Sequence, residues 1–426
     1  MKYIFTLLLL GQIIMATTIE YIETNTSKVP VIYESDTRLP LVTMQFSFTN
    51  SGSVTDTKKA GLAKFSSKVM SEGTKTLGSA AFAEALEAKA IHISASSGSE
   101  TFVVEMSCLK EEFDEALGYF DALLKDPNFS DETINKVKTM TLGSLSSKEN
   151  DFDYIASNEL KAILFEGTVL GQPSSGTIES VKTIELSDVE EFVKSNLVRE
   201  KLIVVIGGDI DIVSAKTKIE KIIEAMPKGT SSEVKNYKVT NEPKEKVVKK
   251  ETEQAYIYFG SPYNIEENSS ELYKAKVATF ILGTGGFGSR LMEEIRVKRG
   301  LAYSAYGRMD VSKSSSYFNG YLQTKLDALD VAKKTVNEVI AEFVKNGVTE
   351  DELKQTKKFL LGSEPLRVET MSQRLNRTFM EFYKGQELGY SLKELEMIRT
   401  LKLEDLNAFI KSHTEINNLS YAIVTK

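Results

Sequence analysis

The sequence predicts an α+β protein of two homologous domains, each a largely antiparallel sheet with helices packed on one face. Its 426 residues exceed one typical domain and suit two domains of roughly 200 residues each. Two further observations support this division: an internal duplication, and an alternation of strand and helix patterns within each copy. We therefore expect two similar halves joined by a linker.

The duplication is visible in two pairs of segments. The stretch TIELSDVEEFVKSNLVREKLIVVIGGD, which begins at Thr183, matches TLKLEDLNAFIKSHTEINNLSYAIVTK, which begins at Thr400. Each predicts a capped helix followed by an apolar strand. In the second pair, DETINKVKTMTLGS from Asp131 matches EDELKQTKKFLLGS from Glu350, and each predicts a helix that ends in Leu-Gly-Ser. Two matches in the same order indicate two copies of one fold.

Strands and helices alternate in blocks within each copy. The first copy predicts, in order, a strand (41–52), an amphipathic helix (60–75), a hairpin (91–108) and helices (111–165). The second copy predicts a strand (254–263), a helix (271–282), a hairpin (302–324) and helices from 326 onward. Short Ser/Gly turns join neighbouring strands, which favours antiparallel pairing and hence the α+β class.

One stretch between the copies has a different composition. Residues 228–254 are polar and rich in Lys and Glu, so they cannot bury much apolar surface. We expect them to form a linker between an N-terminal domain at 17–227 and a C-terminal domain at 255–426.

The N-terminus has the layout of a secretory signal peptide. One Lys is followed by an apolar stretch from Tyr3 to Met15 and then by the small residues Ala16 and Thr17. We expect cleavage near Ala16, which removes residues 1–16 and leaves an exported, periplasmic protein with no membrane span. The alternative is an uncleaved N-terminal anchor.

Charge and residue counts limit the function further. The net charge is −7 and no basic run is interleaved with aromatic residues, which argues against nucleic acid as a partner. The single cysteine, Cys108, cannot form an internal disulfide, so stability must come from packing. The two histidines, His92 and His413, lie one in each copy, and neither has a second ligand at helical spacing. We expect both histidines to be structural or surface residues.

The helix at 60–75 places three polar residues on one face. Lys64, Ser67 and Lys68 are three and four positions apart, so their side chains are neighbours on the helix surface. The apolar residues Leu62, Phe65 and Val69 predict the buried face. Two ammonium groups therefore stand together on the remaining face.

A second candidate site follows the glycine-rich stretch that begins at Leu282. Its glycine spacing does not fit a dinucleotide site and no Gly-Lys-Ser/Thr follows, so a phosphate-binding loop is excluded. The stretch predicts a turn before a helix, with Ser289 as a candidate N-cap and Gly300 as the end. Arg296 then lies in the last turn and Tyr303 on the next strand, where a guanidinium and a phenol could converge on a carbonyl. A solvated arginine and a packed tyrosine are the alternative.

At these motifs the sequence resembles the pitrilysin/insulinase-type zinc peptidases (inverzincins), whose signature is His-x-x-Glu-His on a helix. The resemblance covers nearly the whole mature chain and implies a clamshell of two peptidase-like domains. The family's frame around the signature is present at Gly61, Leu62, Ala63, Phe65, Gly73 and Thr74. The run SRLMEEIRVKRGLAYS matches the motif of the family's C-terminal domain.

The resemblance places the family's zinc site on four residues of this chain. The two histidines of the signature fall on Lys64 and Lys68, and the catalytic glutamate falls on Ser67. The more distant glutamate ligand falls, by spacing, at about Ser144. Zn²⁺ requires imidazole, thiolate or carboxylate ligands, whereas a lysine ammonium repels it. We therefore expect no zinc and no other cofactor in this chain.

The Arg and Tyr of the family's C-terminal motif fall on Arg296 and Tyr303 with the expected separation. In the family this pair contacts the substrate backbone and helps to hold the oxyanion. We infer two classes of function. In the first, the chain is the metal-free subunit of a heterodimeric peptidase that acts on unfolded peptide, and a homologous partner with an intact zinc motif supplies the metal. In the second, the chain is a peptide-binding or scaffolding pseudoenzyme without hydrolytic activity.

Overall fold

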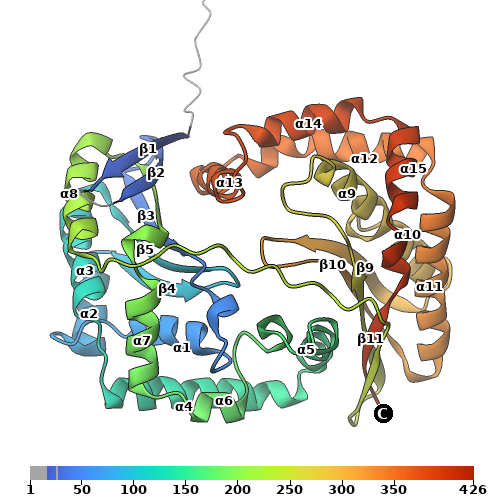
Figure 1. Cartoon of the computed structure of the whole chain (residues 1–426), viewed down its shortest axis with the longest axis horizontal. Coiled ribbons are helices and arrows are strands. Elements are labelled where there is room, and N and C mark those ends of the chain that lie inside the picture. Colours follow the sequence, from blue (N-terminus) through green and yellow to red (C-terminus); the bar gives the residue numbers. More distant parts are fainter. Residues whose placement is uncertain (1–16, 25–26) are drawn as a thin grey trace, which may run out of the picture.

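The computed structural model of the chain describes residues 17–24 and 27–426 (Figure 1). The signal peptide expected at residues 1–16 lies outside the described residues. None of the helices in the described ranges has the length and apolar composition that a membrane crossing requires.

The N-terminal domain is built on a sheet that, within the described residues, has six strands in the order β1-β2-β6-β3-β5-β4. Only β2 and β6 run parallel to each other. The strand β3 and the hairpin β4–β5 confirm the elements expected there, whereas the sequence patterns did not indicate β1 and β2. The strands are β1 (Thr18–Glu23), β2 (Lys28–Ser35), β3 (Leu41–Thr49), β4 (His92–Ser97), β5 (Thr101–Leu109) and β6 (Leu202–Gly208).

The C-terminal domain has a second sheet with the order β7-β11-β8-β10-β9. Its pairs are antiparallel except for β7 with β11. The hairpin β9–β10 confirms the hairpin expected at 302–324. The strands are β7 (Glu245–Lys249), β8 (Gln254–Pro262), β9 (Ala302–Val311), β10 (Ser316–Lys325) and β11 (Ser420–Thr425).

Helices cover the sheets in both domains (Figure 1). The N-terminal domain contributes α1 (Leu62–Met70), α2 (Gly78–Glu87), α3 (Phe113–Lys125), α4 (Asp131–Ser147), α5 (Phe152–Leu164), α6 (Ile178–Lys182), α7 (Leu186–Asn196) and α8 (Ile212–Ala225). The C-terminal domain contributes α9 (Leu272–Thr279), α10 (Arg290–Met292), α11 (Leu329–Asn346), α12 (Glu350–Gly362), α13 (Met371–Tyr383), α14 (Tyr390–Thr400) and α15 (Leu403–Ser412).

The duplicated segments form equivalent elements. The first pair of segments forms α7 followed by β6 in one domain and α15 followed by β11 in the other. The second pair forms α4 and α12. The prediction that both of these helices end in Leu-Gly-Ser is wrong for α4, which continues to Ser147 before a 3-10 turn, η3 (Lys148–Asn150). Leu145 is buried there, so packing extends this helix beyond its glycine.

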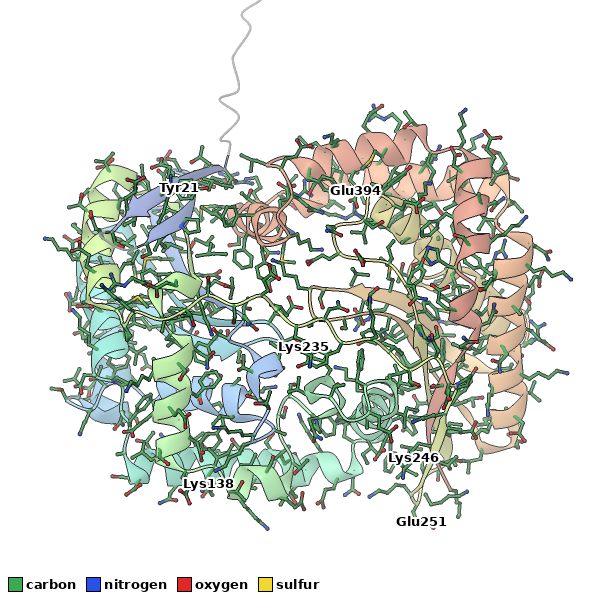
Figure 2. The ribbon with its side chains drawn as sticks, in the orientation of Figure 1. Tyr21, Lys138, Lys235, Lys246, Glu251 and Glu394 are labelled. Carbon is green, nitrogen blue, oxygen red and sulfur yellow. The ribbon has the colours of Figure 1, made fainter. Side chains whose placement is uncertain are left out.

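The polar stretch at 228–254 crosses from the first domain to the second (Figure 1). It also contains β7, which pairs with β11 at the edge of the second sheet. Most side chains of β7 are exposed, and Figure 2 places Lys246 and Glu251 at this outer edge. An edge strand can be polar because it needs one hydrogen-bonded neighbour and no apolar face.

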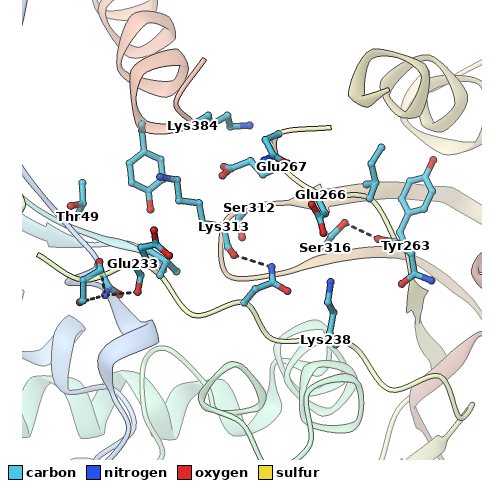
Figure 3. Close-up of a pocket in the computed structure, with 18 of the residues that line it drawn as sticks. Thr49, Glu233, Lys238, Tyr263, Glu266, Glu267, Ser312, Lys313, Ser316 and Lys384 are labelled. Carbon is cyan, nitrogen blue, oxygen red and sulfur yellow. Dashed lines mark hydrogen bonds between the residues drawn. The ribbon is translucent and has the colours of Figure 1, made fainter. Parts of the chain in front are cut away.

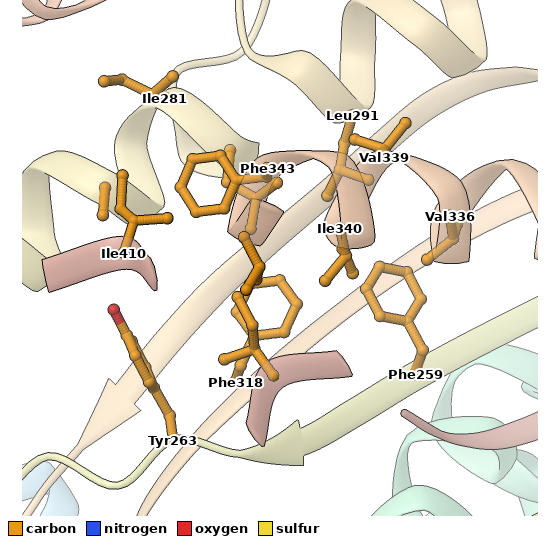
Figure 4. Packing of buried hydrophobic residues seen from close by; sticks show 14 of the residues in the cluster. Phe259, Tyr263, Ile281, Leu291, Phe318, Val336, Val339, Ile340, Phe343 and Ile410 are labelled. Carbon is orange, nitrogen blue, oxygen red and sulfur yellow. The ribbon is translucent and has the colours of Figure 1, made fainter. Parts of the chain in front are cut away.

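Each sheet packs its own helices against one face. In the second domain, alternate residues of β8 and β10, including Phe259 and Phe318, point into a cluster with residues of α11 such as Ile340 and Phe343 (Figure 4). In the first domain, Phe46 and Phe48 of β3 occupy the corresponding core with residues of α3 and α8. This arrangement confirms the α+β class.

The opposite face of each sheet receives a helix from the other domain. Helix α13 packs on β2 and β6 of the first sheet, and α5 packs on β8 and β11 of the second (Figure 1). A glycine provides the space in each case. A Cβ atom at Gly207 would lie 2.7 Å from Leu375 of α13, and one at Gly260 would lie 2.9 Å from Leu164 of α5. The two domains therefore exchange one helix each.

A buried ion pair fastens α13 to the first domain. The carboxylate of Glu34 on β2 is fully buried and accepts hydrogen bonds from Nε of Arg374 at 2.8 Å and from Nη2 at 2.6 Å. The Thr17 hydroxyl donates to the other carboxylate oxygen of Glu34 at 2.7 Å. Residues 340 positions apart in the sequence are thus held together.

Replacing Arg374 with Met should destabilise the protein, because Glu34 then keeps a buried charge without a cationic partner. Breaking a buried ion pair by removal of one partner costs about 3 to 5 kcal/mol of unfolding free energy. Equilibrium urea unfolding of the Arg374→Met variant measures the loss.

Two controls accompany this variant. Lys334→Met removes one partner of an exposed pair on α11, in which Lys334 lies 3.6 Å from Glu338, and should change stability by less than about 0.5 kcal/mol. Combining Arg374→Met with Glu34→Met should recover much of the loss, because the fully buried Glu34 carboxylate is gone and the neighbouring Asp36 keeps its pair with Arg38. An Arg374→Met protein as stable as the wild type would contradict the role of the pair.

Candidate functional site

Helix α1 begins at a buried carboxylate. Asp56 is 5% exposed and accepts hydrogen bonds from the backbone N–H groups of Gly61 at 3.1 Å and Ala63 at 2.9 Å. Gly61 adopts a φ of 87°, which a residue with a side chain rarely does, so a glycine is needed at the start of the helix. Burial raises the pKa of Asp56 to about 7, against the opposing effect of these hydrogen bonds.

The predicted apolar face of α1 is buried at Phe65 and Val69 and half-buried at Leu62. Phe65 and Val69 are buried against residues of α4 and α7, while Ala63 and Met70 join the main core of the domain. Ser67 is 4% exposed, and its hydroxyl donates to the backbone carbonyl of Lys64 at 2.9 Å, within the helix. The side chain of Ser67 therefore satisfies its hydrogen bond locally.

The two lysines of α1 contact neutral hydroxyl groups. Nζ of Lys64 donates to Oγ of Ser175 at 3.2 Å, and Nζ of Lys68 donates to Oγ1 of Thr141 at 2.9 Å. Thr141 lies on α4, one turn before Ser144, and it is buried whereas Ser144 is exposed. Within the described residues, Thr141 is therefore the α4 residue that hydrogen-bonds to Lys68.

This arrangement does not fit a metal ion. Burial lowers the pKa of Lys64 and of Lys68, and the positive charge of Lys148 lowers both further. Hydroxyl and ammonium groups are not ligands for Zn²⁺. The part of the chain that the structure describes contains no group of three or more His, Cys, Asp or Glu side chains that could hold a metal.

The second candidate site lies where α10 leads into β9. The helix continues from α10 into a π-helical turn, η7 (Glu293–Val297), and the chain then reverses at Gly300, whose φ is 61°. Arg296 thus lies in the last turn and Tyr303 on the following strand, as the sequence predicts. Ser289 occupies the predicted N-cap position of α10, but its hydroxyl donates to the carbonyl of Gly286 at 2.8 Å and makes no capping hydrogen bond to the helix.

Arg296 is held between two aromatic rings. Its guanidinium carbon lies 4.2 Å from the ring centre of Tyr303 and 4.7 Å from that of Phe287. Within the described residues, the guanidinium forms no ion pair. Phe287 was not among the residues expected at this site, although it lies in the glycine-rich stretch that begins at Leu282. The stack orients Arg296 and leaves its N–H donors free.

Tyr303 projects from an irregular strand edge. Ala302 and Ala305 of β9 pair with Thr324 and Leu322 of β10, so β9 has one more residue between the two pairs than β10 has. This extra residue defines a β-bulge at Tyr303. The Tyr303 side chain is 82% exposed. A phenol on a bulged edge strand can reach a second molecule, because the contact of the Tyr303 ring with Arg296 leaves most of the side chain exposed.

The two candidate sites remain separate in this chain. Lys64 and Lys68 form hydrogen bonds to residues of the first domain, whereas Arg296 contacts the rings of Tyr303 and Phe287 in the second. In the described ranges, no hydrogen bond, ion pair or ring contact links the two groups. Within the described residues, no direct contact therefore joins the two groups into one site.

A cavity of about 880 Å³ opens between the domains (Figure 3). It is lined by Thr49 and Asn50 of the first domain, residues 231–239, and residues of the second domain that include Glu267, Lys313 and Lys384. None of the site residues expected from the sequence lines this cavity. Its lining comes from segments far apart in the chain, which sequence patterns could not bring together.

A buried carboxylate joins the two domains beside this cavity. Glu100, in the turn between β4 and β5, accepts from the backbone N–H of Ser314 and from the hydroxyl of Tyr383, both at 2.7 Å. Burial, and then the hydrogen bond to Glu100, raise the pKa of Tyr383, so its hydroxyl remains a donor. The hairpin β9–β10 and helix α13 are thus fixed to the same residue.

The histidines lie apart from both candidate sites. Nδ1 of His413 lies 2.8 Å from Oε1 of Glu415, and the ring packs against Tyr263 and Phe409. His92 is exposed on β4. Their positions agree with the structural and surface roles expected for them.

The chain combines the two-domain α+β fold implied by the resemblance with a first candidate site that carries two lysines. The model described as "Insulinase (Peptidase family M16)" matches residues 31–178, and that described as "Peptidase M16 inactive domain" matches residues 183–360. A relative from Helicobacter pylori, described as "Non-peptidase homolog YmxG", is 43% identical over 427 residues that cover 100% of this chain and 98% of that protein. The chain therefore belongs to the peptidase M16 (insulinase) family.

More distant relatives and solved structures agree with this assignment. An "Uncharacterized zinc protease YmxG" from Bacillus subtilis is 25% identical over 74% of this chain and 76% of that protein. The peptidase M16 inactive domain from Pseudomonas fluorescens has a TM-score of 0.88 at 21% identity, over 96% of this chain and 97% of that chain. A protease from Helicobacter pylori has a TM-score of 0.82 at 14% identity, over 96% of this chain and 100% of that chain. The two structures confirm the two-domain fold.

The purified protein should hold no stoichiometric zinc after dialysis and should cleave no unstructured peptide by itself, because ammonium and hydroxyl groups stand where ligands are required. Elemental analysis and a peptide-cleavage assay test this expectation. Stoichiometric zinc together with cleavage that a chelator abolishes would contradict it.

Asp56 should make stability depend on pH. Its folded pKa of about 7 lies above the ordinary value of 3.8, so between these values the folded protein binds a proton that the unfolded chain releases. Stability should therefore fall as pH rises from about 4 to 7, by at most about 1.4 kcal/mol per pH unit for one proton. Asp56→Asn should remove this contribution, which urea unfolding across this pH range measures.

The lost hydrogen bond in Asp56→Asn adds an offset that does not depend on pH. The matched control is Asp211→Asn, which alters an exposed N-cap whose carboxylate accepts from the N–H of Ser214 at 3.1 Å. This variant should keep the pH dependence of the wild type, because it leaves the buried Asp56 unchanged. Parallel pH profiles for wild type and Asp56→Asn would refute the assignment.

Proposed function

We propose that this chain is an exported, non-catalytic subunit of a two-chain zinc peptidase, in which it supplies Arg296 and Tyr303 to a partner that carries the intact zinc motif. The observation that carries the proposal is the unpaired guanidinium of Arg296, stacked on an 82% exposed Tyr303. Lysines at the metal positions of the same chain make a partner necessary for hydrolysis. The family match to a "Non-peptidase homolog" supports the non-catalytic part of the proposal.

The surface around the pair supports binding of a second chain or of a peptide. Phe287, whose ring contacts Arg296, is 70% exposed. Val297, which follows Arg296 in the sequence, is 53% exposed. Aromatic residues and arginine are enriched at protein interfaces. In a complex, Tyr303 would donate to the oxyanion that develops on the scissile carbonyl, and Arg296 would position the substrate carbonyl beside it.

A peptide-binding or scaffolding role without hydrolysis is the second candidate. The polar cavity of about 880 Å³ between the domains favours it, because this cavity could hold a peptide segment without any contribution from Arg296 or Tyr303. Under this alternative, Tyr303 would not affect any reaction.

The test is to co-express the chain with a family member from the same genome that carries His-x-x-Glu-His, and to assay peptide hydrolysis by the assembled complex. Tyr303→Phe keeps the ring and its stack but removes one donor, so kcat should fall about 10²- to 10³-fold while the complex still assembles. Steady-state kinetics and gel filtration measure both quantities.

The matched control is Tyr21→Phe. Tyr21 is also partly exposed and stacked, with Nζ of Lys28 lying 4.4 Å from its ring centre, but it lies on β1 of the other domain. This variant should keep wild-type rates. Wild-type rates from an assembled Tyr303→Phe complex, or the absence of any complex with a zinc-bearing family member, would favour the scaffold role instead.

A further inference from the structure

Three lysines form a cluster at the place where the zinc site of the family would lie. Lys64 and Lys68 lie on successive turns of α1, and Lys148 begins the turn η3 after α4. All three side chains are half-buried. The positive charge of Lys148 acts on Lys64 and Lys68, and the charge of Lys64 also acts on Lys68. We call these residues the lysine cluster.

No carboxylate compensates the lysine cluster within the described residues, since none of the three lysines forms an ion pair there. Lys64 and Lys68 contact the hydroxyls of Ser175 and Thr141, and Nζ of Lys148 lies 4.5 Å from the ring centre of Tyr154.

Two nearby acidic residues have other partners. Asp151 accepts from the backbone N–H of Tyr154 at 3.0 Å, where it caps α5. Asp188 pairs with Lys59, at 2.5 Å, just before α1. These two carboxylates therefore serve the start of α5 and Lys59, and neither pairs with a residue of the lysine cluster.

The absence of a counter-ion has an energetic consequence. Half-buried like charges destabilise the folded state, because each ammonium loses water and repels its neighbours. The chain has 60 acidic and 53 basic residues, so acidic partners are not scarce. A bound anion would offset the repulsion between the ammonium groups, and neutral side chains at the same positions would not repel one another.

We propose that the lysine cluster is an oxyanion-binding site that takes the carboxylate of a peptide segment. Each of Lys64 and Lys68 uses one N–H donor on a hydroxyl and keeps two others. The hydroxyls of Ser175 and Thr141 accept from the lysines, so their own hydrogens remain available to the anion. The site is separate from Arg296 and Tyr303 and requires no zinc-bearing partner.

A carboxylate has two sources in a peptide, namely the C-terminus and an Asp or Glu side chain. Two pairs of fluorescent peptides distinguish these sources. The first pair has one sequence and ends in a free carboxylate or in an amide. The second pair ends in an amide and carries a single internal Glu or Gln. The wild-type mature chain should bind one carboxylate form about 10- to 100-fold more tightly than its neutral counterpart, as expected for charge-assisted hydrogen bonds. Inorganic phosphate should compete with that peptide.

The triple variant Lys64→Met, Lys68→Met, Lys148→Met should lose this preference, because methionine keeps an unbranched side chain and the helix propensity but has no charge. Lys58→Met is the matched control: Lys58 is exposed, 3.8 Å from Glu191, and lies before α1. It should keep the preference of the wild type. Equal affinity of wild type for the acid and neutral peptides, or an unchanged preference in the triple variant, would overturn the proposal.

A melting experiment without anions provides an independent measurement. The triple variant should melt above the wild type, because it removes mutual repulsion, and added phosphate should raise the melting temperature of the wild type more than that of the variant. A triple variant that melts below the wild type or fails to fold would show that the lysines are structural, and would overturn the proposal. Phosphate binding without a preference for a carboxylate peptide would overturn the assigned ligand.

Discussion

The exchange of α5 and α13 determines how the rest of the molecule is arranged. Each helix belongs by sequence to one domain and packs on the sheet of the other, and Gly207 and Gly260 leave room for this approach. The pair formed by Glu34 and Arg374 adds a buried charge interaction to one of the two contacts. The domains therefore form one continuous structure and not two independent lobes on a flexible linker.

The same exchange positions the lysine cluster. Helix α5 starts directly after η3, which carries Lys148, and its first turn is attached to the second sheet. The hydroxyl of Tyr258 on β8 donates to Asp153 at 3.2 Å, and the ring of Phe152 packs against Tyr256 at 5.3 Å. Lys148 in one domain is thus held in place by contacts made in the other.

Sequence patterns predicted the elements that depend on local periodicity. The strand β3, the two hairpins, α1 and the positions of Arg296 and Tyr303 follow from alternation, helical spacing and the helix end at Gly300. The patterns did not identify contacts between distant segments, such as Thr141 with Lys68, Phe287 with Arg296, or the cavity between the domains. The continuously buried strands β6 and β11 carried a local sign of the exchange, because a strand buried on both faces lacks alternation.

The helix exchange also constrains the order in which the chain can fold. The first sheet is complete in sequence at Gly208, but the helix that covers its second face ends at Tyr383. During synthesis from the N-terminus, the faces of β2 and β6 that carry Ile32 and Val205 must stay uncovered while most of the second domain is made. Contacts between such distant residues slow folding, since a long loop must close before they form. Until α13 docks, these apolar faces can pair with other chains, and a chaperone that covers them would protect the unfinished protein from aggregation.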